Sequence, residues 1–191
     1  MKNIVLASGS PRRKALLESL GVKFTVFRPD TDETYISGET PEAYCTRLAR
    51  MKALAGTKEY PDDVIIAADT IVVIDGGILG KPSGRDDAVR MLKTLSGREH
   101  EVITGVSVAC GGRVQVHGEH SGVRFRTLND EEVSAYVSTG ECDDKAGAYA
   151  VQGKGSLIVE GIRGDYFNVV GLPLCALGMM LRNEGIDLLR L

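Results

Sequence analysis

The sequence predicts an α/β fold, with one mixed sheet shaped into two lobes around a cleft. Apolar runs typical of buried strands alternate along the chain with amphipathic segments typical of helices. Helical patterns concentrate toward the two ends, whereas hairpin patterns concentrate in the middle. A chain of 191 residues can bury a substantial core. No linker or repeat divides it, so we expect a single domain over residues 1–191.

The chain begins with a pattern that predicts a strand, a tight turn and a helix. Residues 3–7 are mostly apolar, and Ser10 followed by Pro11 fits the N-cap and the first position of a helix. The N–H groups and the dipole at a helix start attract anions. Hydroxyl and basic side chains surround this helix start: Ser8, Ser10, Arg12, Arg13 and Lys14. The segment predicts a phosphate site, and the alternative is an ordinary capped helix with solvated basic residues.

The next segments predict a strand, a loop and a second helix. Residues 23–28 predict a short strand, and an acidic loop over residues 29–38 follows it. A helix opens at Pro41. Its apolar stripe consists of Tyr44, Leu48, Met51 and Ala55. Lys52 lies one turn after Leu48, so we expect it at the edge of this stripe.

A strongly apolar strand follows over residues 64–68. Asp69 and Thr70 interrupt the apolar pattern before it resumes over residues 71–74. The Asp-Gly-Gly sequence at residues 75–77 is a hairpin signal, because an Asp-Gly pair accepts the left-handed backbone of a tight turn.

The second half continues the alternation. Asn129 and Glu132 have the spacing of a capping box, which fixes the start of one helix. A loop rich in Asp, Gly and Ala runs from residue 141 to residue 155. We expect helices over residues 83–95, 130–139 and 173–184, and strands over residues 101–110, 114–118, 123–127 and 156–161.

Composition excludes several function classes. The net charge is −3, so the chain has no basic excess with which to bind bulk nucleic acid or an anionic membrane surface. No apolar run approaches the roughly 18 residues of a membrane-spanning helix, and no export signal is indicated. The four cysteines are far apart in the sequence, which fits reduced thiols in a cytoplasmic protein rather than a zinc site.

Asp69 is the strongest single candidate for chemistry. A carboxylate within a mostly apolar strand is costly to bury unless a metal, a cation or hydrogen bonds compensate it. It is therefore a candidate metal ligand or general base, and the alternative is an Asp69–Thr70 pair that caps a bend. Glu33 in the acidic loop is a candidate second ligand for a hard cation such as Mg²⁺, or else a solvated loop acid.

Three further side chains suit a nucleotide ligand. Lys52 and Lys81 are placed to neutralise phosphates, although a snorkelling lysine and a surface turn lysine are the ordinary alternatives. Gln152 carries an amide that can donate and accept hydrogen bonds at once, as recognition of a base edge requires. Most exposed glutamines have no such role.

Seven segments, in this order along nearly the whole chain, resemble the Maf family. That family comprises nucleotide pyrophosphatases named for septum-formation inhibition and similar in fold to inosine triphosphate pyrophosphatases. Asp144-Lys-Ala-Gly-Ala-Tyr149 followed by Gln152-Gly153 resembles its dTTP/UTP subgroup. The segments are residues 6–13, 49–53, 68–72, 79–82, 96–105, 144–153 and 168–173.

The resemblance implies a role for each candidate. Asp69 is implied as the catalytic acid or base, and the pairing of Asp69 with Glu33 as metal ligands stays the expectation drawn from the residues themselves. The implied specificity positions are Arg12, Thr70 and Gln152. The side chains implied to contact phosphate or metal are Ser8, Glu33, Lys52 and Lys81. Arg13, at the helix start, is a further candidate for holding the triphosphate.

We therefore expect an enzyme that hydrolyses nucleoside triphosphates, preferring dTTP and UTP, to monophosphate and pyrophosphate. The expected cofactor is a divalent cation, Mg²⁺ or Mn²⁺, and the expected role is the removal of non-standard or excess nucleotides in the cytoplasm. The substrate is the expected partner, and a second copy of the chain, as a homodimer, is the one macromolecular partner considered. The alternatives are a nucleotide-sensing regulator of cell division with little turnover, and a phosphotransferase.

Overall fold

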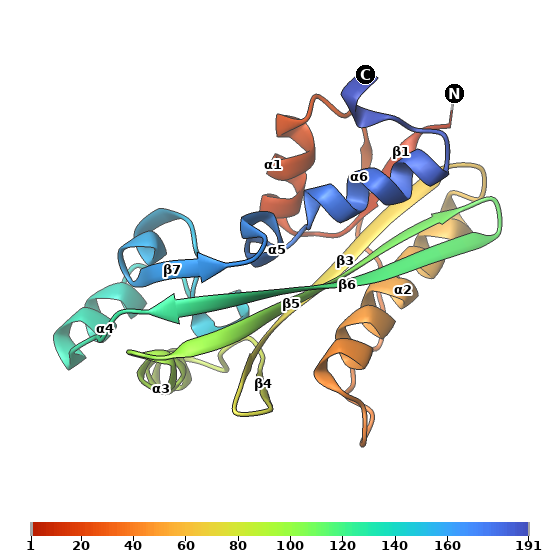
Figure 1. The fold of residues 1–191 in the computed structure, drawn as a ribbon. Coiled ribbons are helices and arrows are strands. Elements are labelled where there is room, and N and C mark those ends of the chain that lie inside the picture. Colours follow the sequence, from red (N-terminus) through yellow and green to blue (C-terminus); the bar gives the residue numbers. More distant parts are fainter. Residues whose placement is uncertain (1, 191) are drawn as a thin grey trace. The chain divides into compact units, whose positions relative to one another are not determined.

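The computed structural model describes residues 2–190 and contains one seven-stranded mixed sheet (Figure 1). The strand order is β2-β1-β3-β5-β6-β7, and β4 pairs with β3. The α/β class expected from the sequence is confirmed. The elements in chain order are β1 (Ile4–Ala7), α1 (Pro11–Ser19), β2 (Thr25–Phe27), α2 (Pro41–Glu59), β3 (Val64–Ile74), β4 (Gly77–Leu79), α3 (Arg85–Leu95), β5 (Glu99–Cys110), β6 (Arg113–Phe125), α4 (Asp130–Val137), η1 (Ala146–Ala148), η2 (Gly153–Leu157), β7 (Val159–Arg163), α5 (Tyr166–Val170), α6 (Leu174–Asn183) and η3 (Leu188–Arg190).

The chain divides into two compact units, in agreement with the two lobes expected from the sequence. Unit 1 contains the described parts of Met1–Asp69, Thr104–Glu119 and Gly171–Leu191. Unit 2 contains Thr70–Ile103 and His120–Val170. The long strands β3, β5 and β6 each continue from one unit into the other.

In unit 1, β1 lies between two parallel neighbours. Val5 is opposite Thr25 of β2 and Ile65 of β3. Parallel strands need a crossover connection, and covering helices make such strands apolar on both faces. All four residues of β1 and the first five of β3 are buried accordingly. One core cluster of this unit consists of Val5, Ala7, Ala53, Ile65, Ala67 and Ala109.

Helix α2 lies so close to its neighbouring strands that glycine is required at two contacts. A Cβ atom at Gly56 of α2 would lie 2.5 Å from Cγ2 of Ile65. A Cβ atom at Gly105 of β5 would lie 2.6 Å from the carbonyl oxygen of Cys45 and 2.8 Å from Cα of Thr46. The backbone of α2 and that of β5 are therefore in direct contact.

Of the apolar stripe expected for α2, only Leu48 is buried, and the rest of the prediction is wrong. Most of the buried face consists of small residues, because the helix lies so close to the strands. Lys52 lies on this buried face and not at its edge, since it is four residues after Leu48 and four before Gly56. The buried residues of the helix are Cys45, Leu48, Ala49, Ala53 and Gly56.

Unit 2 confirms several expected local structures. Asp75 and Gly76 form the β3–β4 turn, and both have positive φ angles, 52° and 75°. The capping box of Asn129 and Glu132 is present at the start of α4. Helix α3 buries the four expected residues, Ala88, Met91, Leu92 and Leu95.

The structure corrects three expected strands and adds one helix. Strand β3 runs without interruption through Asp69 and Thr70. Strand β6 is continuous where two strands were expected, and β7 begins only at Val159 because η2 occupies the preceding residues. Helix α5 was not expected, since five residues are too few to show a helical period. No helix of the described residues is both long and apolar enough to cross a membrane.

A buried histidine belongs to the core of unit 2. His100 Nε2 lies 2.8 Å from the hydroxyl of Tyr149, and its ring contacts Phe125 edge to face. Its Nδ1 has no hydrogen-bond partner among the described residues. Burial lowers the pKa of His100 from 6.5 to about 4, because an imidazolium in this apolar surrounding loses its hydration.

Replacing Gly105 with alanine is expected to destabilise the fold by about 1–3 kcal/mol, because the new methyl group overlaps backbone atoms of α2 that cannot rotate away. Urea unfolding would measure the loss. Gly178→Ala in α6 is the matched control: a Cβ atom there meets nothing within 4 Å. Because alanine favours a helix more than glycine does, the control should gain stability. Equal stability of the Gly105→Ala variant and the wild type would contradict the close contact.

His100 is expected to make the fold sensitive to acid. The unfolded chain takes up the proton near pH 6.5 but the folded chain only near pH 4, so stability falls as the pH decreases through this window. The loss attributable to His100 is about 2–3 kcal/mol at pH 4.5. His100→Gln, which retains a hydrogen-bonding partner for Tyr149, should remove this part of the pH dependence, whereas exposed His117→Gln should not. Chemical unfolding at pH 7 and pH 4.5 measures the change in the free energy of unfolding between the two pH values. An identical change in all three proteins would refute the assignment.

Candidate active site

Three charged side chains meet in unit 1 and form its candidate active site. The Nζ atom of Lys52 lies 2.6 Å from a carboxylate oxygen of Asp69 and 2.6 Å from one of Glu33. The Lys52 and Asp69 side chains are 12% and 13% exposed, whereas Glu33 is 51% exposed. Two carboxylates with one ammonium group leave a net charge of −1. The cluster therefore pairs a largely buried carboxylate with its counter-ion and keeps a second carboxylate open to solvent.

The position of Lys52 follows from the packing of α2. Its side chain extends from the buried face, between the two glycine contacts at Cys45 and Gly56. Because the helix backbone is fixed on both sides of Lys52, the packing of α2 sets the point from which the lysine side chain extends. This explains how a lysine is held beside a strand carboxylate.

Asp69 is held at its backbone as well as at its side chain. The Cys45 thiol donates a hydrogen bond to the Asp69 carbonyl oxygen over 3.1 Å, and its sulfur accepts one from the Gly105 N–H over 3.1 Å. Burial, and to a lesser extent the charge of Asp69, raises the pKa of the Cys45 thiol to about 12. Cys45 therefore stays protonated and can donate to Asp69.

The loop that carries Glu33 is tied to the first turns of α2. Tyr44 donates its hydroxyl hydrogen to the Glu33 carbonyl oxygen over 2.8 Å. Arg47 donates to the Thr34 carbonyl oxygen over 3.0 Å and forms an ion pair with Glu39. The ring of Tyr35 contacts Tyr44 edge to face. These contacts bring an exposed loop carboxylate to Lys52.

The start of α1 supplies a second group of polar side chains in unit 1. The buried Ser8 hydroxyl accepts hydrogen bonds from Arg13 and from the Ser10 N–H. Arg13 also donates to the Gly171 carbonyl oxygen over 2.7 Å. Burial lowers the pKa of Arg13, and the carboxylate of Asp69 offsets part of this effect. Ser10 is the N-cap as expected, but its hydroxyl makes no capping hydrogen bond.

The two arginines of this helix start differ in their surroundings. Arg13 is anchored by Ser8 and Gly171, and its charge interacts with that of Asp69. Arg12 precedes it on α1 and is half-buried. The structure therefore brings Ser8, Arg13, Glu33, Lys52 and Asp69 together in one unit.

The remaining candidates belong to unit 2. Thr70 follows Asp69 in β3 and is half-buried. Lys81 is exposed, and the preceding Gly80 accepts a hydrogen bond from the Gly147 N–H over 3.0 Å. Gln152 is exposed at the N-cap position of η2.

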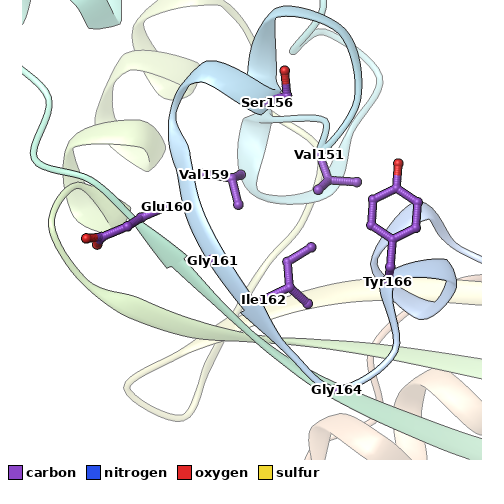
Figure 2. A pocket seen from close by; sticks show the side chains of 8 residues that line it. All are labelled: Val151, Ser156, Val159, Glu160, Gly161, Ile162, Gly164 and Tyr166. Atoms are coloured by element: carbon purple, nitrogen blue, oxygen red, sulfur yellow. The ribbon is translucent and has the colours of Figure 1, made fainter.

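Unit 2 also contains a pocket of about 440 Å³ beside the segment that carries Gln152. Figure 2 shows Val151 just before η2, Ser156 in η2, Val159 and Ile162 on β7, and Tyr166 on α5. Most of these side chains are apolar, as is usual for pockets that bind small molecules.

The carboxylates of unit 1 fit a hard divalent cation whose coordination is completed from outside the protein. Asp69 and Glu33 both reach the same lysine nitrogen, so their oxygens converge on one region. Mg²⁺ is usually bound by one or two carboxylates together with substrate phosphates and water. Within residues 2–190, no group of three or more His, Cys, Asp or Glu side chains has metal-binding geometry.

Sequence reasoning missed the residues that hold the candidates in place. Cys45 could have been found, because it lies seven residues before Lys52 and therefore on the same helix face. Tyr44 was assigned to an apolar stripe, although its hydroxyl holds the Glu33 loop. The contact of Arg47 with Thr34 has no sequence spacing that would reveal it.

Comparisons with known proteins agree with this fold. A family model described as Maf-like protein matches residues 3–184. The chain is 49% identical over 182 residues to a dTTP/UTP pyrophosphatase of Clostridioides difficile, covering 94% of each chain. It is 51% identical to a dTTP/UTP pyrophosphatase of Caldanaerobacter subterraneus, covering 95% of this chain and 88% of that protein.

The structure is also similar to that of a HAM1 protein from Coxiella burnetii, with a TM-score of 0.57. The two chains are 18% identical, and the match covers 96% of this chain and all of that one, so the likeness extends to the fold alone. The family match covers nearly the whole chain, and the two named relatives are about half identical to it. The chain belongs to the Maf family.

Proposed function

We propose that this protein is a nucleoside triphosphate pyrophosphatase that hydrolyses dTTP and UTP to the monophosphate and pyrophosphate. The observation that carries this proposal is the cluster of Asp69, Lys52 and Glu33 in the same unit as the Ser8–Arg13 helix start. The cluster supplies a carboxylate for acid–base chemistry, and the helix start supplies cationic and hydroxyl groups for phosphates. The two relatives named dTTP/UTP pyrophosphatases support the same activity.

In this proposal the triphosphate binds at the start of α1. The guanidinium groups of Arg12 and Arg13 and the Ser8 hydroxyl face its oxygens, and Arg13 is already oriented by its bond to the Gly171 carbonyl oxygen. Lys52 and Lys81 neutralise the charge that develops on the leaving pyrophosphate. Charge placed where the transition state needs it, and held there beforehand, accelerates phosphoryl transfer.

Asp69 is the proposed general base. Its carboxylate accepts a proton from a water molecule whose oxygen attacks the α-phosphorus, and the bond from this phosphorus to the bridging oxygen of pyrophosphate breaks. Asp69 and Glu33 would hold Mg²⁺ or Mn²⁺, which when bound neutralises phosphate charge and polarises the phosphoryl group. Lys52 restrains the Asp69 carboxylate, and the Cys45 thiol restrains the backbone below it.

Base selection is assigned to Gln152 and Thr70. Uracil and thymine present an N3–H donor between two carbonyl acceptors, which a primary amide can match.

We propose that the whole chain works as one functional domain, and that it removes non-standard or excess pyrimidine nucleotides in the cytoplasm. The alternative of a regulator with little turnover is not favoured, because a sensor needs no general base and the named relatives are pyrophosphatases.

A nucleotide panel tests the proposed reaction. With Mg²⁺ or Mn²⁺ present, UTP and dTTP should be hydrolysed roughly ten- to a hundredfold faster than CTP, ATP or GTP, because a wrong base leaves unpaired the hydrogen-bonding groups that it covers when it binds. Phosphorus NMR should show pyrophosphate and monophosphate as the first products. Orthophosphate and nucleoside diphosphate as first products would refute attack at the α-phosphorus. Fastest turnover of GTP would refute the assigned specificity but not the type of reaction.

The role of Asp69 is tested by a nearly isosteric change. Asp69→Asn should lower kcat by about 10²–10⁴-fold, because the amide cannot accept the proton. Circular dichroism should show an unchanged fold. Exposed Asp62→Asn, which removes the same charge from unit 1, is the control and should keep wild-type kcat. An Asp69→Asn variant that retains more than about a tenth of the wild-type rate would remove Asp69 from the mechanism.

A further inference from the structure

The segment Ala150–Gly155 of unit 2 presents Gln152 to solvent while its backbone is held on both sides. The Ala150 N–H donates to the hydroxyl oxygen of Tyr136 over 3.1 Å. The Tyr136 side chain is itself buried in the core of unit 2. One end of the segment is therefore fixed to α4, and the exposed Gln152 lies two residues after Ala150.

A single carboxylate fixes the other end. Glu141 accepts a hydrogen bond from the Lys154 N–H over 3.1 Å with one oxygen, and from the Gly155 N–H over 3.2 Å with the other. These N–H groups belong to the second and third residues after Gln152 and lie within η2. Hydrogen bonds to a charged acceptor are stronger than those between neutral groups. Glu141 thereby holds the backbone that follows Gln152.

Two glycines allow this close contact. At Gly153, φ is +64°, and a Cβ atom would lie 2.8 Å from a carboxylate oxygen of Glu141. At Gly155 a Cβ atom would lie 1.8 Å from the carbonyl oxygen of Ala150, which closes the segment on itself. The backbone from Ala150 to Gly155 is thus a tight loop closed around the Glu141 carboxylate.

Glu141 is in turn fixed at the end of α4. Its N–H donates to the hydroxyl oxygen of Thr139 over 3.1 Å, and the same hydroxyl donates to the Tyr136 carbonyl oxygen over 2.7 Å. Tyr136 and Thr139 therefore connect both ends of the loop to one helix. The catalytic groups proposed in unit 1 take no part in these contacts.

We propose that Glu141 is a positioning residue for base selection, which holds the backbone of residues 152–155 so that the Gln152 amide meets the base in one orientation. This inference rests on the proposed function and adds a residue to it. A freely rotating amide can turn over and accept cytosine as readily as uracil, because cytosine presents the reversed donor and acceptor pair. Selectivity therefore requires that the amide be held in one orientation, and a fixed backbone is a condition for this because it sets where the Gln152 side chain begins. The flanking residues Val151 and Ser156 also line the pocket of Figure 2, so the same contacts hold its wall.

The test compares Glu141→Ala, Glu141→Gln and wild type with UTP and CTP as substrates. Glu141→Ala should reduce the ratio of kcat/KM for UTP over that for CTP by roughly tenfold, mainly through slower reaction of UTP. Glu141→Gln keeps one acceptor oxygen and should fall between the two. Exposed Glu131→Ala, which removes the same charge from unit 2, should keep the wild-type ratio. Amide hydrogen exchange at Lys154 and Gly155 should become faster in Glu141→Ala and, to a smaller extent, in Glu141→Gln, but not in Glu131→Ala.

The outcomes separate the role of Glu141 from the proposed function. A folded Glu141→Ala variant with the wild-type ratio would overturn the role of Glu141, even if its melting temperature falls. If Glu141→Ala does not fold, Glu141→Gln decides, and an unchanged ratio together with faster exchange at Lys154 overturns the role. A wild-type protein that hydrolyses neither UTP nor dTTP would overturn the proposed function instead, whereas the exchange measurement would still report on the loop.

Discussion

The close approach of α2 to the strands of unit 1 is the constraint on which the candidate active site depends. Contacts at Gly56 and Gly105 leave no space for a Cβ atom, so the helix has one position against the sheet. Lys52 lies between these contacts, and Tyr44 and Arg47 extend from the same helix to the Glu33 loop. A displacement of α2 would move the lysine and the loop carboxylate together. Close packing in this unit therefore determines where the charges of Lys52 and Glu33 lie.

The charges of the cluster explain why a carboxylate is tolerated within an apolar strand. Asp69 is 13% exposed, and removing a charge from water is costly unless it is paired and hydrogen-bonded. Lys52 provides the pair, and Arg13 adds a positive charge in the same unit. The second carboxylate, on Glu33, remains half exposed. The charge of Asp69 in the strand is thus paired, whereas the carboxylate of Glu33 in the loop is accessible to solvent. An accessible carboxylate is what the binding of a further cation requires.

The sequence predicted features that depend on only a few neighbouring residues. Asp69 was found because a buried acid is costly, and the turn at Asp75 and the capping box at Asn129 were found because short patterns determine them. The buried face of α2 was predicted wrongly except at Leu48, because hydrophobicity favours large side chains whereas most positions of this close contact hold small ones. Glu141 was missed for another reason: it binds backbone N–H groups, which every residue type except proline carries.

The two units hold their functional side chains by different means, and this has a consequence for how the protein can change. In unit 1 the position of Lys52 is set by core packing, so a change in specificity made there would also disturb stability. In unit 2 the Gln152 segment is fixed through hydrogen bonds to its backbone by Glu141 and Tyr136. Such contacts do not depend on which side chain stands at position 152. The residue proposed to read the base is therefore replaceable without loss of its support, whereas Lys52, proposed for phosphate chemistry, is not.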